Sequence, residues 1–197
     1  MKEYVSIENK EDGIDITEEL ETPLEVLLYD NPVLRKASRK VKYLDDETIQ
    51  LIQDMAETML IQQGIGLAAP QVGVSKRIFT FITDFASLDS DDDEISVKVA
   101  INPQILEREG EIIAYEGCLS YPDHVAYVNR AMKVKVRYQN MDMEKVEEEY
   151  TGLAARVFQH ELDHLEGILF IDRMEPDSLK HVDELKKEDE SEDDLID

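Results

Sequence analysis

The pattern of hydrophobic and polar positions predicts two helices separated by a series of short strands. In residues 45–62, apolar side chains recur at helical spacing, and the acids of the first turn suit the positive end of the helix dipole. The same spacing predicts a second helix from about Gly152 to Leu165, which Gly167 would end. Before the first helix, residues 23–44 contain two prolines and predict an extended or turn-rich segment.

Six segments between the two helices have the character of strands. Residues 77–83 form an apolar run typical of a buried strand. Several of the strands alternate apolar with charged residues, and the five later ones are expected at 97–102, 111–115, 125–128, 132–138 and 145–150. Residues 84–94 hold six acids and no base, so we expect an exposed loop there. The order predicts an α+β fold, in which antiparallel strands pack around the second helix, with one further N-terminal helix.

Charge is distributed unevenly along the 197 residues. The formal net charge is −25, and residues 1–22 carry eight acids against two lysines, whereas residues 175–197 carry eleven acids against three lysines. We therefore expect an acidic N-terminal extension (1–22), one globular domain (23–174) and an acidic C-terminal tail (175–197), with both ends solvated. So much negative charge argues against direct binding of nucleic acid, because the phosphate backbone would be repelled.

The composition favours a soluble protein in a reducing compartment. Cys118 is the single cysteine, so no intramolecular disulfide can form. The first residues are acidic where a signal peptide would be basic, and no run approaches the roughly 20 apolar residues of a membrane span. We expect a bacterial-type cytoplasmic location. An organelle is the alternative, if a transit peptide has been removed from the protein.

The segment His160-Glu161-Leu162-Asp163-His164 carries the strongest chemical signal. On a helix, its two histidines lie one turn apart on the same face, so both imidazoles can hold one metal ion. Glu161 lies beside them and can accept a proton from the attacking water. The alternative is an amphipathic helix with two unrelated histidines, but this pattern arises by chance only on the order of one time in a hundred. By itself the motif indicates a metallohydrolase.

Two upstream segments contain candidates for the remaining chemistry. Cys118, in Glu116-Gly117-Cys118-Leu119-Ser120, is a candidate third ligand, although a lone cysteine is more often a small buried hydrophobe. The run Gly64-Ile65-Gly66-Leu67-Ala68-Ala69-Pro70-Gln71 suits close approach of backbone to a ligand. It follows a helix, so it is no dinucleotide fingerprint. The Gln71 amide is a donor that could face a developing oxyanion.

Together the three segments resemble the signature motifs of the peptide deformylase family, in the family's order, over roughly residues 23–174. The resemblance implies a metal-dependent hydrolase that removes the N-formyl group from the N-terminal formylmethionine of nascent polypeptides. It implies the metal ligands Cys118, His160 and His164. It also implies that Glu161 is the general base and acid, and that the Gln71 side chain and the Leu119 N–H stabilise the oxyanion.

The same resemblance implies roles for residues around the centre. Gly66 would lie close to the substrate backbone. The pocket for the first side chain, normally methionine, would be lined by Ile65, Leu153 and Val157, for which core packing is the alternative. Another expected feature is a polar pair that holds the cysteine loop, formed by Glu116 and Arg130; a plain surface salt bridge is the alternative for this pair.

The resemblance further implies one divalent ion, Fe²⁺ in the cell, with Zn²⁺, Ni²⁺ or Co²⁺ as substitutes. The expected partners are formylmethionyl nascent peptides, with transient ribosome association not made through the acidic tail. The chain departs from many relatives at Tyr121-Pro122-Asp123-His124-Val125, and we expect His124 and His181 to be surface residues without partners. Two other function classes stay open: a metallopeptidase with a third ligand other than Cys118, and a non-catalytic metal protein that binds a basic partner.

Overall fold

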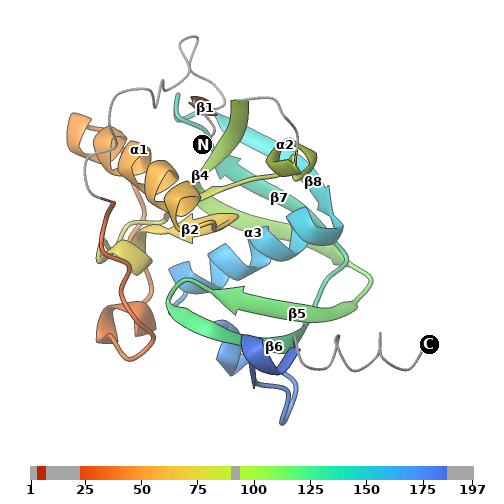
Figure 1. Ribbon diagram of the computed structural model, residues 1–197. Coiled ribbons are helices and arrows are strands. Elements are labelled where there is room, and N and C mark those ends of the chain that lie inside the picture. The colour runs from red at the N-terminus through yellow and green to blue at the C-terminus, as the bar shows by residue number, and fades with distance from the viewer. Residues whose placement is uncertain (1–3, 8–22, 90–93, 186–197) are drawn as a thin grey trace.

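A central helix between two sheets organises the fold. The computed structural model describes residues 4–7, 23–89 and 94–185. Helix α3 (Gly152–Leu165) runs between a larger sheet and a smaller one (Figure 1). The α+β fold class predicted from the sequence is confirmed. Within those residues, no helix is long and apolar enough to cross a membrane.

The larger sheet has six strands, five of them in the order β2-β3-β4-β7-β8, with β1 paired to β4. Their bounds are β1 Tyr4–Ile7, β2 Gly66–Ala68, β3 Ile78–Phe81, β4 Glu94–Glu109, β7 Lys133–Gln139 and β8 Lys145–Thr151. All neighbours are antiparallel except β1 and β4, which are parallel. The expectation that residues 1–22 are wholly a solvated extension is therefore wrong at β1, and residues 8–22 lie outside the described part.

The smaller sheet has the order β5-β6-β9 and covers the other side of α3. Its strands are β5 Ile112–Cys118, β6 Tyr121–Arg130 and β9 Lys180–His181. Strand β9 lies in the expected tail, so the boundary at residue 174 falls too early; residues 186–197 lie outside the described part. The expectation for the two histidines also needs correction, because His124 and His181 are register partners with ring centroids 5.2 Å apart.

The two long helices begin and end close to the predicted residues. Helix α1 (Asp46–Ile61) is capped by Asp45, whose side chain accepts a hydrogen bond from the Thr48 N–H at 2.9 Å. The short helix α2 (Ala86–Asp89) occupies part of the expected loop, so that expectation is wrong there. Three 3₁₀ helices are also present: η1 Pro32–Arg35, η2 Ala69–Val72 and η3 Phe170–Asp172.

Strand β3 is buried on both faces, which explains its continuous apolar sequence. Ile78 belongs to the core shared with α1, whereas Phe79 and Phe81 face α3. Phe158 of α3 meets both phenylalanines edge to face, at centroid distances of 5.0 and 5.7 Å. These contacts fix the helix that carries both histidines against the larger sheet.

Replacing Gly167, which follows α3, should destabilise the fold more than the same change at Gly152, where α3 begins. Both glycines have a positive φ, of 77° and 56°. A Cβ at Gly167 would lie 2.7 Å from the carbonyl carbon of Arg35, whereas nothing lies within 4 Å of one at Gly152. We expect Gly152→Ala to cost about 1–2 kcal/mol of strain, and Gly167→Ala about 2–5 kcal/mol of strain plus overpacking. Urea unfolding measures both, and equal costs would contradict the close packing of Gly167.

Candidate active site

Three potential metal ligands from two separate elements meet at one point. His160 and His164 lie one turn apart on α3, with their Nε2 atoms 3.2 Å apart. Cys118 ends strand β5, and its Sγ lies 3.3 Å from the His164 Nε2. All three ligand atoms lie within 4.8 Å of one another. The structure therefore brings together the cysteine and the two histidines singled out in the sequence.

The spacing and chemistry of this set fit a divalent metal ion. Sulfur and nitrogen ligands about 2.0–2.3 Å from a tetrahedral ion lie about 3.3–3.6 Å from one another. The observed separations of 3.2 and 3.3 Å come close to these values. One thiolate and two imidazoles suit several first-row metals, and three protein ligands leave one coordination position for water or substrate.

A buried carboxylate orients the first histidine. Glu116 Oε2 accepts hydrogen bonds from His160 Nδ1 at 3.0 Å and Arg130 Nη2 at 2.9 Å. Burial by itself raises the pKa of Glu116, but the hydrogen bonds from His160 and Arg130 lower that pKa to about 2, so the group is an anion. Because Nδ1 faces an acceptor, Nε2 is left to face the other ligands. Glu116 and Arg130 are 8% and 6% exposed, which excludes a plain surface salt bridge.

The network around this carboxylate contains residues that sequence reasoning missed. Arg156 Nη2 donates to Glu116 Oε1 at 2.8 Å. Arg130 also pairs with Asp163, whose Oδ2 accepts a further hydrogen bond from Arg173 Nε at 2.6 Å. Arg156 and Asp163 lie four residues before and three after His160. That helical spacing places them on the histidine face and is the signal that could have found them.

Glu161 lies against the backbone of β2. A Cβ added to Gly66 would lie 2.8 Å from Glu161 Cδ, so only glycine leaves room for this carboxylate. Glu161 is 4% exposed, and none of the described residues makes a hydrogen bond with its Oε2. Burial raises the pKa of Glu161 to about 7. A buried carboxylate with a free oxygen is thus held next to the two histidines that are candidate metal ligands.

The Gln71 amide has a fixed orientation toward the cysteine. Its Oε1 accepts a hydrogen bond from the Ala68 N–H at 2.8 Å. Its Nε2 donates to Ser120 Oγ at 3.2 Å and lies 3.5 Å from Cys118 Sγ. Leu119 directly follows the cysteine, in the turn between β5 and β6. The two residues expected to stabilise an oxyanion therefore lie next to Cys118, Gln71 in space and Leu119 in the chain.

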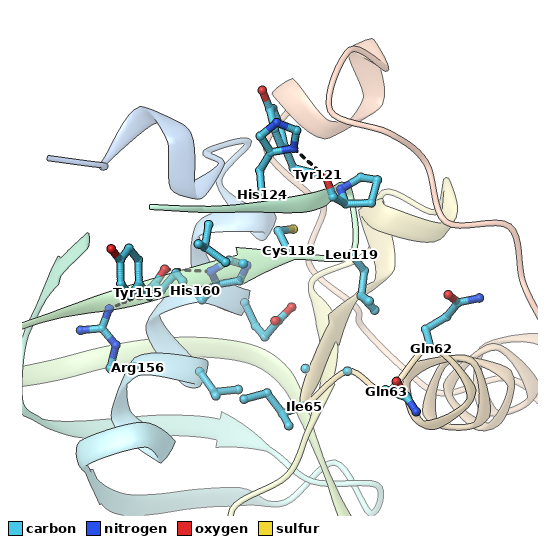
Figure 2. Close-up of a pocket in the computed structure, with 18 of the residues that line it drawn as sticks. Gln62, Gln63, Ile65, Tyr115, Cys118, Leu119, Tyr121, His124, Arg156 and His160 are labelled. Atoms are coloured by element: carbon cyan, nitrogen blue, oxygen red, sulfur yellow. Dashed lines mark hydrogen bonds and ion pairs between the residues drawn. The ribbon is translucent and has the colours of Figure 1, made fainter. Parts of the chain in front are cut away.

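A cleft of about 600 Å³ opens onto this centre. In Figure 2, Cys118, Leu119 and His160 lie around it, and Ile65 lies on the far wall. Val157 is buried in the wall, whereas Leu153 is 48% exposed and forms part of the rim.

Other lining residues were not assigned to the cleft by sequence reasoning: Gln62, Gln63, Tyr115, Tyr121, His124 and Val182. They come from the end of α1, both strands of the β5–β6 hairpin and the segment after β9. Only the fold brings these segments together, and no local pattern marks them.

Replacing Gly66 by alanine should reduce kcat for the hydrolysis expected from the sequence, without unfolding the protein. The new methyl group would occupy the space of the Glu161 carboxylate, which would have to move. A displacement of about 1 Å at a reacting group can cost about 10²-fold in rate, so we expect a loss of that order in kcat. Steady-state kinetics and thermal unfolding would be measured together. Undiminished kcat in Gly66→Ala would contradict the placement of Glu161.

Comparisons with known proteins agree with this geometry. A family model described as polypeptide deformylase matches residues 23–180. The peptide deformylase of Thermotoga sp. (strain RQ2) is 46% identical over 152 residues, which are 77% of this chain and 87% of the relative. The peptide deformylase of Acidobacterium capsulatum is 45% identical over 149 residues, 76% of this chain and 85% of the relative.

Solved structures show the same likeness in three dimensions. The crystal structure of peptide deformylase from Thermotoga maritima aligns with a TM-score of 0.72 at 42% identity, over 79% of this chain and all of that one. A Met-Ala-Ser-bound peptide deformylase from Acinetobacter baumannii aligns at 0.70 and 36% identity, over 78% and 99%. The chain belongs to the peptide deformylase family, metal-dependent hydrolases that remove the N-formyl group from nascent polypeptides.

Proposed function

We propose that this chain deformylates N-formylmethionyl peptides at the centre formed by Cys118, His160 and His164. The observation that carries the proposal has two parts: a thiol and two imidazoles meet within 4.8 Å, and Cys118, His160 and the Glu161 carboxylate line one cleft. We further propose that the catalytic domain runs from residue 23 to about residue 181, since β9 belongs to the smaller sheet.

The proposed ion is Fe²⁺, with Zn²⁺, Ni²⁺ or Co²⁺ as substitutes in the purified protein. A divalent cation at this centre supplies Lewis-acid chemistry, which makes water a stronger nucleophile at neutral pH. The proposed ligands are Cys118 Sγ, His160 Nε2 and His164 Nε2, in keeping with their separations. Glu116 holds the His160 ring in the required orientation through Nδ1.

The other residues of the site move protons and receive charge. Glu161 takes a proton from water, whose oxygen attacks the formyl carbon. The Gln71 Nε2–H and the Leu119 N–H donate to the oxyanion that develops on the formyl oxygen. The carbon–nitrogen bond then breaks, and Glu161 gives its proton to the leaving amine. One water is consumed, and formate and a free amino terminus are released.

Substrate selection follows from the cleft. The methionine side chain would lie against Ile65, Val157 and Leu153, and the peptide backbone would pass close to Gly66. Nascent peptides of a bacterial-type cytoplasm are the proposed substrates, and transient ribosome association would not involve the acidic tail. Such a tail would be repelled by ribosomal RNA.

The test compares three substrates with the metal-loaded protein: formyl-Met-Ala-Ser, acetyl-Met-Ala-Ser and a longer peptide blocked at both ends. Release of formate from the first peptide, with no hydrolysis of the other two, supports the proposal. Cleavage inside the blocked peptide would instead support a metallopeptidase. A metal-loaded protein inactive on all three would favour the non-catalytic binding protein.

A further inference from the structure

Arg156 connects the two elements that carry the proposed metal ligands. It lies on α3, four residues before His160, and is 4% exposed. Its guanidinium contacts four acceptors, one carboxylate and three backbone carbonyls, with Nη2 sharing its two hydrogens among three of them: Ile112 O (2.8 Å, from Nη1), Glu116 Oε1 (2.8 Å), Ala114 O (3.0 Å) and Val128 O (3.0 Å). The acceptors belong to β5 and β6, so one side chain of α3 binds both strands of the hairpin.

This attachment bears directly on the cysteine. Cys118 ends β5, the strand in which three of the four acceptors lie, whereas His160 and His164 lie on α3 itself. The planar guanidinium offers its donors in a fixed fork, so its bonds define the separation of hairpin and helix more narrowly than a flexible ammonium would. The distance between the thiol and the imidazoles therefore depends on Arg156.

Arg156 also completes the set of donors around Glu116. Oε1 accepts from Arg156 Nη2 at 2.8 Å and Arg130 Nε at 3.0 Å, and Oε2 accepts from Arg130 Nη2 and His160 Nδ1. Two arginines from different elements thus hold the carboxylate from one side, which directs Oε2 at the histidine.

We propose that Arg156 is a positioning residue for the metal centre. It holds the cysteine hairpin against the histidine helix and fixes the carboxylate that orients His160, so the three ligands are in place before an ion binds. The inference rests on the proposed function, since it concerns the same centre. Arg156 acts through Glu116 and the hairpin, and it does not touch the reacting atoms.

The experiment titrates the metal-free full-length protein with Co²⁺. Thiolate-to-cobalt charge-transfer absorption reports Cys118 ligation, and the visible bands report coordination geometry. The variants are Arg156→Met and Arg156→Lys. The control is Arg137→Met, which removes an arginine from a half-exposed ion pair with Glu147 on the larger sheet. Apparent Co²⁺ affinity, visible spectrum and unfolding temperature would be recorded for each.

We expect Arg156→Met to weaken Co²⁺ binding about 10–100-fold, the usual effect of losing a partner behind a metal ligand, and to alter the visible bands. Arg156→Lys should fall between Arg156→Met and the parent, because an ammonium cannot reach all four acceptors. Arg137→Met should bind like the parent. At saturating Co²⁺, kcat for the formyl peptide should fall in Arg156→Met while KM is unchanged.

Parent-like Co²⁺ affinity and spectrum in Arg156→Met would overturn the proposal, even if that variant unfolds at a lower temperature. If Arg156→Met does not fold, the same result in Arg156→Lys would overturn it. If the parent protein shows no charge-transfer band, the proposed metal centre is contradicted, and the role of Arg156 with it. If the parent shows the band and the Arg156 variants bind Co²⁺ like the parent, only the positioning role is contradicted.

Discussion

Glu161→Gln is expected to reduce kcat for formate release by at least about 10²–10⁴-fold, because the variant cannot accept the proton of the attacking water. Glutamine has the size of glutamate and can occupy the same space against Gly66. The fold and the metal content should therefore be those of the parent. Formate would be measured with formyl-Met-Ala-Ser as substrate, at saturating metal.

The matched control for this loss is Glu166→Gln. Glu166 caps the same helix, and its exposed side chain forms an ion pair with Arg77 at 2.7 Å. Replacing it removes one negative charge near the site without touching the cleft, so kcat should stay near the parent value. A parent-like kcat in Glu161→Gln, or an equal loss of kcat in Glu166→Gln, would contradict the proposed role of Glu161.

The second large effect is expected at Cys118, whose removal should abolish both tight metal binding and turnover. Cys118→Ala leaves two imidazoles as protein ligands. Loss of a residue that only hydrogen-bonds to a metal ligand reduces metal affinity about 10–100-fold, so loss of the ligand itself should reduce it more. Metal content after dialysis and formate release would be measured together. Both should fall far below those of the parent.

Cys118→Asp provides the comparison for that result. A carboxylate is an accepted ligand of such ions, so this variant should retain more metal than Cys118→Ala. If Cys118→Ala kept one ion per chain and hydrolysed peptides, the third ligand would lie elsewhere. The metallopeptidase alternative would then regain support.

The sequence predicted the long helices well because their patterns are local. Spacing of apolar residues placed the second helix at the bounds that α3 has in the structure. By contrast, β1, β2 and β9 contain only two to four residues each, and they exist through pairing with other strands, which for β1 and β9 are distant in the sequence. No local periodicity can predict such strands.

Strand β4 shows a different limit. The alternation of apolar residues predicted a strand at 97–102, whereas β4 extends from Glu94 to Glu109. Its pairing with β7 shifts register between Ile101 and Gln104 and again between Ile105 and Glu107. Each irregularity interrupts the two-residue period on which the prediction depends. The tertiary pairing continues where the pattern stops.

The residues proposed to bind metal or take part in the reaction could be singled out in the sequence because each lies in a short motif of fixed spacing. The network that holds them was only partly predictable. Arg156 and Asp163 resemble ordinary polar residues of an amphipathic helix until the hairpin lies over them. His124 and His181 are 57 positions apart, and only the pairing of β6 with β9 makes them neighbours.

The most direct test of the proposed centre is the X-ray absorption spectrum of the Zn²⁺-loaded protein, recorded for the parent and for Cys118→Ala. The account predicts one sulfur at about 2.3 Å and two imidazole nitrogens at about 2.0–2.1 Å in the parent, with the sulfur absent in the variant. A parent spectrum with no sulfur ligand, or the same spectrum from both proteins, would contradict the centre formed by Cys118, His160 and His164.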